Sequence, residues 1–393
     1  MKLTFGDEVE AFRREFLAWL ADNRPTAEEM AREPAVSSAH VPGWASRWIR
    51  RLFDAGWLVP GWPPERGGRN AGPVETLVYQ EELTKAGIPR TTNPQGLGIV
   101  APSILDYGTE GQIRDYAMPI LRGERTACLG MSEPGAGSDL AALSTRAVLD
   151  GDRFVINGQK VWTSGANYAD FCFLFCRTDP SAPKHKGISV VLVDMSTPGI
   201  TVRPLAEIVN PEHPDLNEVF FSDVMVPKAN LVGQMNNGWA MANGSLAHER
   251  GMVWLSSVLQ LENEIDTVLA EAPAALARLT APERAVVADG LVESAIDVAA
   301  ARCLGYRAFA KLVRGGSAPE QALMKAFCSE SQRRLSLRAA EMGTDRKVDI
   351  GQGPTRDGTW IERYFVTFAA TISAGTSEIQ RNIIAERILG LPR

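Results

Sequence analysis

The hydrophobic spacing of this chain changes twice, and this double change limits its possible architectures more than any other feature. Apolar residues recur at helical spacing up to about residue 122, and the same period returns from about residue 233 onward. Between them, residues 123–232 hold several short β runs separated by Pro, Gly and Asp. Short strands at this density predict a compact β-barrel or sandwich. The sequence therefore predicts a helical domain over 1–122, a β-domain over 123–232 and a helical domain over 233–393.

Local signals place individual elements inside these three segments. The Asn157-Gly158 pair that follows the run Phe154–Ile156 predicts a hairpin turn, because Asn-Gly is the strongest short-range turn signal. Further β runs are expected at 171–176, 188–193, 200–205 and 219–226. Helices are expected at 73–85 and 102–107 before the β segment, and at 239–270, 282–314, 319–343 and 375–389 after it.

Composition excludes several classes of protein. With 45% hydrophobic and 22% charged residues, the chain has the composition of an ordinary soluble globular protein. The formal charge of −6 argues against a nucleic-acid binder and against binding to an anionic membrane. No apolar run approaches the roughly 18 residues of a membrane helix, and the acidic, amphipathic N-terminus does not have a signal-peptide pattern. The five scattered cysteines predict reduced thiols, no metal site and a cytoplasmic location.

Two loops carry residues suited to binding a flat, polar ligand. Residues Met131–Asp139 include two glycines and a proline, so backbone amides can point at an acceptor, and Ser132 and Ser138 add hydroxyls. In Lys160–Gly165, Trp162 offers a flat apolar face with hydroxyls beside it, which suits a planar heterocycle such as flavin. Taken alone, the first loop fits a plain connector equally well, and a single Trp is typical of packing between domains.

Four stretches, in order along the chain, resemble the acyl-CoA dehydrogenases. They are MSEPGAGSD, NGQKVWTSG, VPKANLVG and ISAGTSEIQRNIIAERILGLPR, and together they extend over nearly the whole chain. The resemblance implies an α+β fold with an N-terminal helical domain, a middle β-barrel domain and a C-terminal four-helix bundle, in agreement with the hydrophobic spacing. It also implies FAD, with its ring between the β-domain and the bundle. The shared reaction is α,β-dehydrogenation of an acyl thioester, in which a carboxylate takes the α-proton and the β-hydrogen leaves as hydride to flavin N5.

Position by position, the resemblance implies binding roles for residues of both loops and of the tail. Ser132 would bond the pyrimidine edge of the flavin, Trp162 would pack on its ring, and Ser164 would offer a hydroxyl near N5. Ser138 would also face the CoA part of the substrate, with Arg250 and Gly375 as further substrate contacts. The full set of expected cofactor contacts is Leu129, Met131, Ser132, Gly137, Ser138, Trp162, Thr163, Ser164, Thr376, Ser377 and Glu378.

The resemblance places the catalytic base at Glu249. Many family members carry the base in a Glu-Gly-Thr of the C-terminal segment, but Ala374 occupies that position here. A minority, including those for isovaleryl and long-chain substrates, carry it on an earlier helix just before an Arg, which corresponds to Glu249 and Arg250. Leu246 and Met252 flank Glu249 at helical spacing, so it interrupts an apolar face where a carboxylate is costly to bury. Without the resemblance, a solvated or Arg-paired surface Glu would be the simpler interpretation.

The sequence leaves three activities open. The first is a dehydrogenase that passes electrons to an electron-transfer flavoprotein, the second an acyl-CoA oxidase that uses O₂, and the third a scaffolding subunit of a heteromeric dehydrogenase. The small Ala374 beside the expected acyl path makes room for a bulky or branched chain. The ending ERILGLPR resembles actinobacterial members, some of which act on steroid side chains. A bulky acyl-CoA of that kind is the expected substrate.

The residues expected to hold the FAD pyrophosphate are missing. Family homotetramers complete each FAD site with an Arg and a Gln from a neighbouring subunit. Here the region around Arg278 lacks the Arg-x-x-Phe-Gly pattern, and Ala340 stands where the Gln would be. Glu341 beside it would add negative charge near a pyrophosphate. These departures predict an α2β2 heterotetramer in which a related subunit supplies the pyrophosphate half; the alternative is that the loops have drifted and other groups hold the cofactor.

Overall fold

The computed structural model describes residues 5–315, 320–342 and 359–392, and the side chains of residues 243–254 and 321 lie outside that description. Two compact units make up the chain. The first comprises Met1–Tyr79, Gly87–Glu207 and Pro211–Glu249, and the second comprises Gln80–Ala86, Ile208–Asn210 and Arg250–Arg393. Domain boundaries at residues 122 and 232 stay a prediction. Among the described residues, none of the helices combines the length and the apolar character that crossing a bilayer requires.

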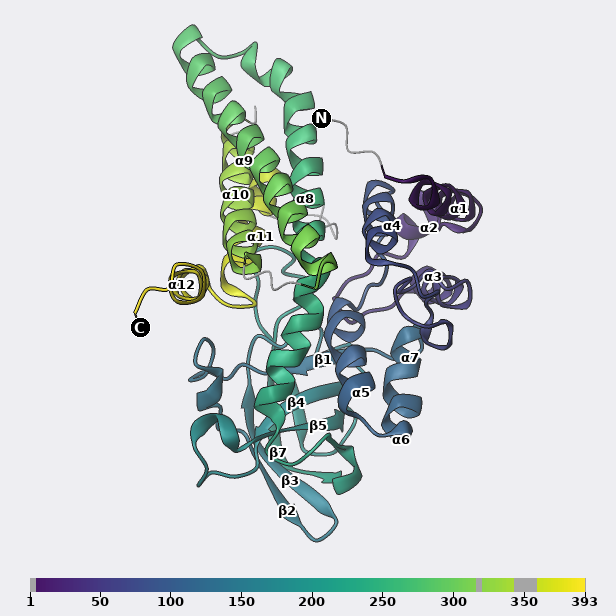
Figure 1. Ribbon diagram of the computed structural model, residues 1–393. Helices are drawn as coiled ribbons and strands as arrows, with labels where there is room; N and C mark the ends of the chain where they lie inside the picture. Colours follow the sequence, from purple (N-terminus) through teal and green to yellow (C-terminus); the bar gives the residue numbers. More distant parts are fainter. Residues whose placement is uncertain (1–4, 316–319, 343–358, 393) are drawn as a thin grey trace. The chain divides into compact units, whose positions relative to one another are not determined.

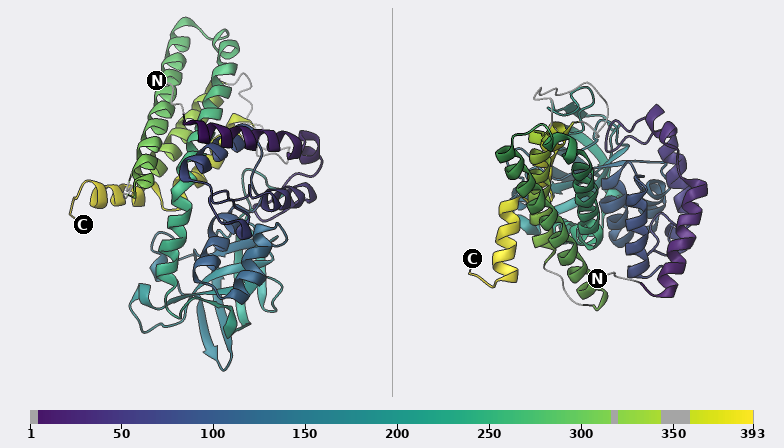
Figure 2. Two further views of the ribbon diagram at one scale, coloured as in Figure 1. Left: turned by 45° about the vertical axis from the view of Figure 1, so that its right-hand side comes forward. Right: turned by 90° about the horizontal axis from the view of Figure 1, so that it is seen from above.

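An aromatic cluster forms the core of the N-terminal helices. The centroid of the Phe16 ring lies 4.8 Å from that of Trp57 and 4.7 Å from that of Tyr79, and all three side chains are buried. Figures 1 and 2 show α5, α6 and α7 beside the sheet of the same unit. The helices of this segment are α1 (Asp7–Asn23), α2 (Ala27–Arg32), α3 (Gly43–Asp54), α4 (Pro73–Lys85), α5 (Ala101–Tyr107), α6 (Glu110–Gln112) and α7 (Met118–Leu121). The helix predicted at 73–85 is therefore confirmed, as is the one at 102–107 to within a residue.

The predicted β segment is confirmed as one sheet with the strand order β6-β7-β3-β2-β4-β5-β8, to which β1 is added by pairing with β4. Strand β4 is buried along nearly its whole length, because β1 and β5 flank it and its side chains fill the core. The strands are β1 (Ala127–Gly130), β2 (Arg146–Asp150), β3 (Arg153–Lys160), β4 (Phe171–Arg177), β5 (Ile188–Asp194), β6 (Ile200–Pro204), β7 (Asn217–Pro227) and β8 (Leu231–Val232).

The hairpin turn predicted at Asn157-Gly158 is wrong. Strand β3 continues through both residues, and the turn between β2 and β3 lies at Gly151-Asp152 instead. The pairing of β3 with β7 shifts register here, which makes the pair part of a β-bulge. Asn157 uses its side chain across the strands, since its Nδ2 donates to Asp223 Oδ1 at 2.9 Å and its Oδ1 accepts from Asp223 N at 2.9 Å. Gly158 has a φ of 153°, and an added Cβ would lie 2.5 Å from Thr145 Oγ1, so the glycine serves a close approach between strands and not a turn.

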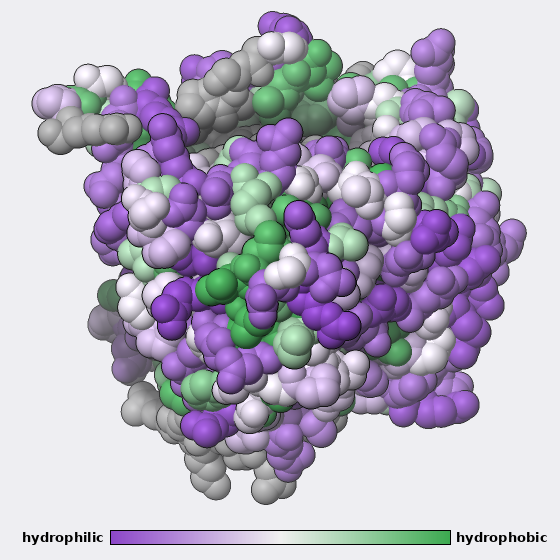
Figure 3. All heavy atoms as spheres, turned by 90° about the horizontal axis from the view of Figure 1, so that it is seen from below, coloured by the Kyte–Doolittle hydropathy of each residue, from purple (hydrophilic) through white to green (hydrophobic). Residues whose placement is uncertain are grey.

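The outward face of the hairpin carries an apolar patch. Val148, Val155 and Met225 are cross-strand neighbours on β2, β3 and β7, and Val148 and Met225 are 59% and 51% exposed. Figure 3 looks at the end of the molecule where these strands lie in Figure 1, and it shows apolar side chains gathered among polar ones. The alternation of the strand puts this patch on the side opposite the buried Phe154 and Ile156.

The second unit consists mainly of long helices, α8 (Gly238–Leu276), which begins in the first unit, then α9 (Ala281–Val313), α10 (Gln321–Met342), α11 (Trp360–Ile372) and α12 (Ser377–Ile383). Helix α10 packs against both α9 and α11. The predicted helices at 239–270, 282–314 and 319–343 are confirmed apart from their ends, whereas α11 was not predicted. Figure 2 shows α12 leading away from the other helices of its unit.

Gly158→Ala tests the close approach at the bulge. A Cβ at residue 158 would lie 2.5 Å from Thr145 Oγ1, so the backbone has to move and we expect a loss of about 2 kcal/mol or more in the free energy of unfolding. Gly98→Ala is the matched control, because no atom lies within 4 Å of its added Cβ. Urea denaturation followed by circular dichroism measures both, and equal losses in the two variants would contradict this account.

Candidate active site

A buried ion pair attaches the loop Met131–Asp139 to strand β3. Lys160 has no exposed surface, and its Nζ donates to Met131 O and to Glu133 Oε1, both at 2.9 Å. Glu133 in turn accepts hydrogen bonds from Ser144 N at 2.6 Å and from Thr145 N at 2.8 Å. Each charge is thus neutralised and each carboxylate oxygen is occupied, which is the condition for burying an ion pair. The loop is consequently fixed before any ligand binds.

The pKa values of the pair reflect these contacts. Burial alone would raise the pKa of Glu133, but the charge of Lys160 and hydrogen bonds from Lys160 and Thr145 lower it to about 2. Burial lowers the pKa of Lys160, and the Glu133 carboxylate opposes that effect. Sequence reasoning missed this pair. The one local sign of the pair was a Lys at a core-facing position of a strand. An unpaired charge there would carry a large desolvation cost, so a buried acidic partner was to be expected.

The structure brings the two predicted loops together within the first unit. Val161 N donates to Ser132 O at 3.0 Å, which links the first loop directly to the end of β3. Leu129, Met131 and Ser132 are partly buried, whereas Gly137 and Ser138 are exposed. The first three residues can therefore line a bound ligand, and the last two are accessible to one from solvent.

Trp162 is held in an unusual conformation beside that loop. Its φ is 58°, in the left-handed region that non-Gly residues seldom adopt, and its side chain is 62% exposed. Thr163 behind it is buried, and its Oγ1 has no hydrogen-bond partner in the described part of the chain. Ser164 is partly buried. An open indole face next to an unsatisfied hydroxyl is an arrangement that a polar, planar ligand would complete.

A second network, also missed from the sequence, connects these loops through Asp215. Ser38 donates from N and Oγ to the two carboxylate oxygens of Asp215 at 2.7 and 2.8 Å, and Gly165 N donates to Asp215 O at 2.7 Å. Asn93 Nδ2 then donates to Ser38 O at 2.9 Å and to Ala127 O at 3.0 Å. Ala127 begins β1, which leads into the first loop. The network joins positions that are far apart in sequence, so no local sequence pattern predicts it.

The tail residues expected to contact the cofactor lie in the second unit. Thr376 caps helix α12 through its Oγ1, which accepts from Ile379 N at 3.3 Å. Ser377 is buried and its Oγ donates to Glu330 Oε1 at 2.7 Å, so its hydroxyl proton is already used. Glu378 is exposed, and hydrogen bonds from its own backbone and from Thr376 lower its pKa.

The turn before α12 is fixed by a lysine. Ala374 and Gly375 adopt φ values of 53° and 95°. Lys325 Nζ donates to Gly375 O at 2.6 Å, and burial lowers the pKa of Lys325 while Glu330 and Glu378 oppose that effect. This lysine is a further positioning residue for the tail that sequence reasoning did not select.

Some predicted residues cannot be placed by their side chains. Glu249 and Arg250 belong to α8, but their side chains lie outside the described residues. The substitutions at the expected pyrophosphate positions, Ala340 and Glu341, lie near the end of α10, and Glu341 is exposed. The catalytic and substrate roles of the first pair stay predictions.

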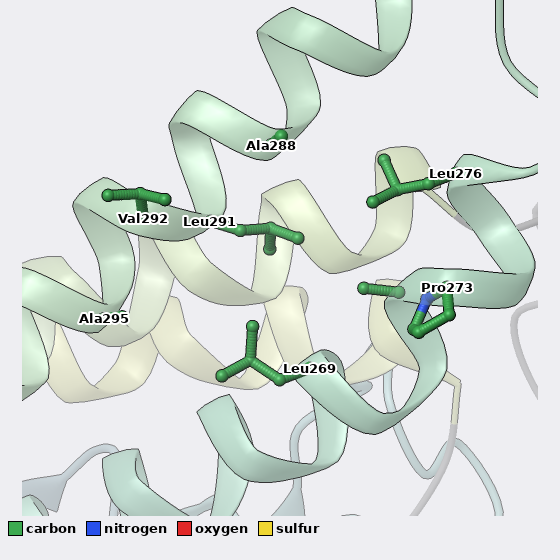
Figure 4. A pocket seen from close by; sticks show the side chains of 8 residues that line it. Leu269, Pro273, Leu276, Ala288, Leu291, Val292 and Ala295 are labelled. Carbon is green, nitrogen blue, oxygen red and sulfur yellow. The ribbon is translucent and has the colours of Figure 1, made fainter.

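An apolar cavity of about 280 Å³ lies between the end of α8 and the start of α9 (Figure 4). No charged side chain lines it, and none of the predicted site residues does. Its lining consists of Leu269, Ala272, Pro273, Leu276, Ala288, Leu291, Val292 and Ala295. Without a polar group it cannot orient a reacting atom, so it is not a second candidate for the catalytic centre.

Comparison with known proteins identifies the family. Residues 6–124, 128–224 and 236–389 match the N-terminal, middle and C-terminal domain models of acyl-CoA dehydrogenase, respectively. The chain is 35% identical over 397 residues to acyl-CoA dehydrogenase IpdE1 of Mycobacterium tuberculosis, with 98% of both chains covered. It therefore belongs to the acyl-CoA dehydrogenase family and is an oxidoreductase.

Two solved structures of the family are similar over the full chain. One is titled "Tcur3481-Tcur3483 steroid ACAD", with 30% identity, a TM-score of 0.83 and 100% of both chains covered. The other is the ChsE4-ChsE5 complex from Mycobacterium tuberculosis, with 29% identity, a TM-score of 0.76 and 100% of both chains covered. These matches confirm the predicted fold of helical, β and helical parts.

Members of this family are FAD-dependent flavoproteins. The first unit fits the ring of such a cofactor on three observations: the exposed indole of Trp162, the unsatisfied hydroxyl of Thr163, and the exposed hydroxyl of Ser138 on a loop fixed from behind. No cluster of metal-binding side chains occurs among the residues that the structure describes.

Glu133→Gln tests the ion pair behind the loop. The pKa of Glu133 is about 2 in the folded protein and about 4.3 in an unfolded chain. Its stabilising contribution is therefore present above about pH 4.3 and is lost as the pH falls toward 2. We expect the variant to be less stable by about 3 kcal/mol at pH 7, and the difference to shrink at acid pH.

Urea unfolding at a series of pH values measures this difference, with the exposed Glu212→Gln as the control. A difference between wild type and Glu133→Gln that is the same at every pH would show that the carboxylate charge does not stabilise the loop.

Proposed function

We propose that this chain catalyses the FAD-dependent α,β-dehydrogenation of a bulky or branched acyl-CoA, of which a steroid side-chain thioester is an example. The observation that supports it most is the fixed loop Met131–Asp139 beside the open face of Trp162. The substrate class is inferred from similarity to a structure titled a steroid acyl-CoA dehydrogenase and from the small Ala374.

In this proposal the residues of the first unit orient the ring. Ser132 and Ser138 donate to its polar edge and to the CoA part of the substrate, while Leu129, Met131 and Gly137 line it. Trp162 covers one face, Ser164 offers its hydroxyl near N5, and Thr163 is a further contact of the cofactor. FAD, when bound, supplies the acceptor for the β-hydrogen as hydride. Thr376, Ser377 and Glu378 contact the dinucleotide part, and Ser377 does so while its proton remains bonded to Glu330.

Glu249 removes the α-proton in this proposal. A carboxylate is needed on the side of the acyl chain opposite the flavin, in a pocket from which water is excluded, because desolvation raises its basicity. Ala374 has no side chain that could take the proton, and Glu249 lies on α8. Arg250 and Gly375 contact the substrate.

Glu249→Gln is expected to retain fold and flavin and to lose nearly all turnover, because only the proton acceptor is removed. The measurement is anaerobic bleaching of the flavin by acyl-CoA in a stopped-flow spectrometer. Asp266→Asn, an exposed acid on the same helix, is the control and should bleach at the wild-type rate. Retention of a rate within about tenfold of wild type, or 1.4 kcal/mol of barrier, would show that another residue is the base.

The active enzyme in this proposal is an α2β2 heterotetramer that passes electrons to an electron-transfer flavoprotein. Support comes from similarity to a two-protein complex, ChsE4-ChsE5, and from Ala340 and Glu341 at positions that would otherwise serve the pyrophosphate. The partner is a related subunit, and it supplies that half of the FAD site. Slow reoxidation of the reduced flavin in air is expected, and fast reoxidation would indicate the oxidase instead.

Cofactor stoichiometry tests the heteromer. The chain expressed alone is expected to bind FAD weakly, and co-expression with a related subunit is expected to yield one FAD per unlike pair, measured by flavin absorbance and light scattering. A stable homotetramer that carries one FAD per chain without a partner would rule the heteromer out while leaving the dehydrogenase activity possible.

A further inference from the structure

The pairing between β3 and β7 becomes irregular directly before Trp162. Lys160 pairs with Val219, so a regular continuation of the ladder would place Trp162 opposite Asn217. Thr163 takes that place instead, because its N donates to Asn217 O at 3.0 Å. Trp162 is therefore one extra residue on its side of the pair, as in a β-bulge, and its φ of 58° accommodates the extra residue. Bulges of this kind change the direction in which a side chain points.

Asn217 holds the residue after the bulge by both of its backbone groups. Besides accepting from Thr163 N through its main chain, Asn217 donates from Nδ2 to Thr163 O at 3.1 Å. The same Nδ2 donates to Asp215 O at 2.8 Å, and this oxygen also accepts from Gly165 N at 2.7 Å. One side-chain amide thus connects both ends of the short segment 163–165, within the first unit.

The Asn217 amide is needed at this position as a donor. Asn217 has no exposed surface, and two of the three oxygens to which Nδ2 donates are main-chain carbonyls. A reversed amide would place its own oxygen against these carbonyls, so the orientation is fixed. Asn217 Oδ1 has no hydrogen-bond partner among the residues that the structure describes. An unpaired buried acceptor costs about 1–3 kcal/mol, and the chain accepts that cost while it keeps the donor.

We propose that Asn217 is a positioning residue that keeps the Trp162 indole turned toward the flavin ring. This inference rests on the proposed function, in which Trp162 packs on that ring. Trp162 cannot fix its own direction by packing, because 62% of its side chain is exposed. Its direction is therefore set by the backbone of Trp162 and Thr163, which Asn217 holds. Asn217 itself touches neither the cofactor nor the substrate.

The test compares Asn217→Ala with Asn230→Ala in the FAD-loaded enzyme with its related subunit. Asn230 is the matched control, because its Nδ2 also donates to a main-chain oxygen of the first unit, Leu192 O at 2.7 Å. An indole stacked on a flavin ring quenches the flavin fluorescence. We expect Asn217→Ala to raise the fluorescence of bound FAD toward that of Trp162→Gly, and Asn230→Ala to leave it as in wild type.

Flavin bleaching by isovaleryl-CoA and by cholestenoyl-CoA is measured in parallel. A displaced indole leaves the ring less well oriented, so Asn217→Ala should bleach at least about tenfold more slowly than wild type. Asn217→Ser keeps a shorter donor and should lie between wild type and Asn217→Ala in both measurements. It also provides the comparison with wild type if the Ala variant does not fold.

A double-mutant cycle separates positioning from a general loss of stability. In Trp162→Gly the indole is absent, and Gly adopts the left-handed conformation without strain. Adding Asn217→Ala to that background should therefore change the bleaching rate by no more than about twofold. A purely structural role of Asn217 would instead slow bleaching equally in both backgrounds.

Three results would overturn the inference. They are wild-type flavin fluorescence in Asn217→Ala, an equal loss of bleaching with and without Trp162, and an effect of Asn230→Ala as large as that of Asn217→Ala. The proposed function fails by a different result, the absence of bleaching in wild type with both thioesters. The fluorescence of bound FAD does not depend on turnover, so it tests the role of Asn217 in that case as well.

Discussion

The ion pair between Lys160 and Glu133 is the interaction on which the candidate site depends. Lys160 is buried in the core of the sheet, where its charge is tolerated only because Glu133 of the loop forms an ion pair with it. The carboxylate in turn requires Ser144 and Thr145 at the start of β2. One core position of β3 thereby determines the course of the loop, and the loop determines where Ser132 meets Val161. Preorganisation of this kind removes the entropic cost of ordering the loop from ligand binding.

The periodicity of the chain was sufficient to predict most elements of the fold, and its failures have identifiable causes. Helix α4 starts at a Pro and ends with a Lys, so both of its limits are marked locally. Helix α11 was missed because WIERYFVTFAATI is rich in aromatic and β-branched residues, which are weak helix formers. Its capping box of Thr359 and Glu362 was the available signal. Asn157-Gly158 misled because long-range pairing, not the dipeptide, decides between a turn and a bulge.

The site was predictable where its residues are contiguous and unpredictable where they meet across the fold. The stretches around Ser132 and Trp162 were found by composition and family resemblance, and the structure brings them together. Which of their atoms contact a cofactor stays a prediction, as does the role of Glu249. The pairing of Asp215 with Ser38, 177 residues apart, has no sequence signature, because each partner alone looks like an ordinary loop residue.

The left-handed backbone at Trp162 bears on any attempt to engineer this protein. A non-Gly residue in that region carries roughly 1–2 kcal/mol of strain, and a largely exposed indole recovers little of it by packing. A redesign guided only by thermal stability would choose Gly or Asn at this position and would gain robustness by doing so. The same exchange would remove the aromatic surface beside the loop. Under the proposed function, in which Trp162 packs on the flavin ring, stability and activity therefore place opposite demands on residue 162, and it should be held constant in any stabilised variant.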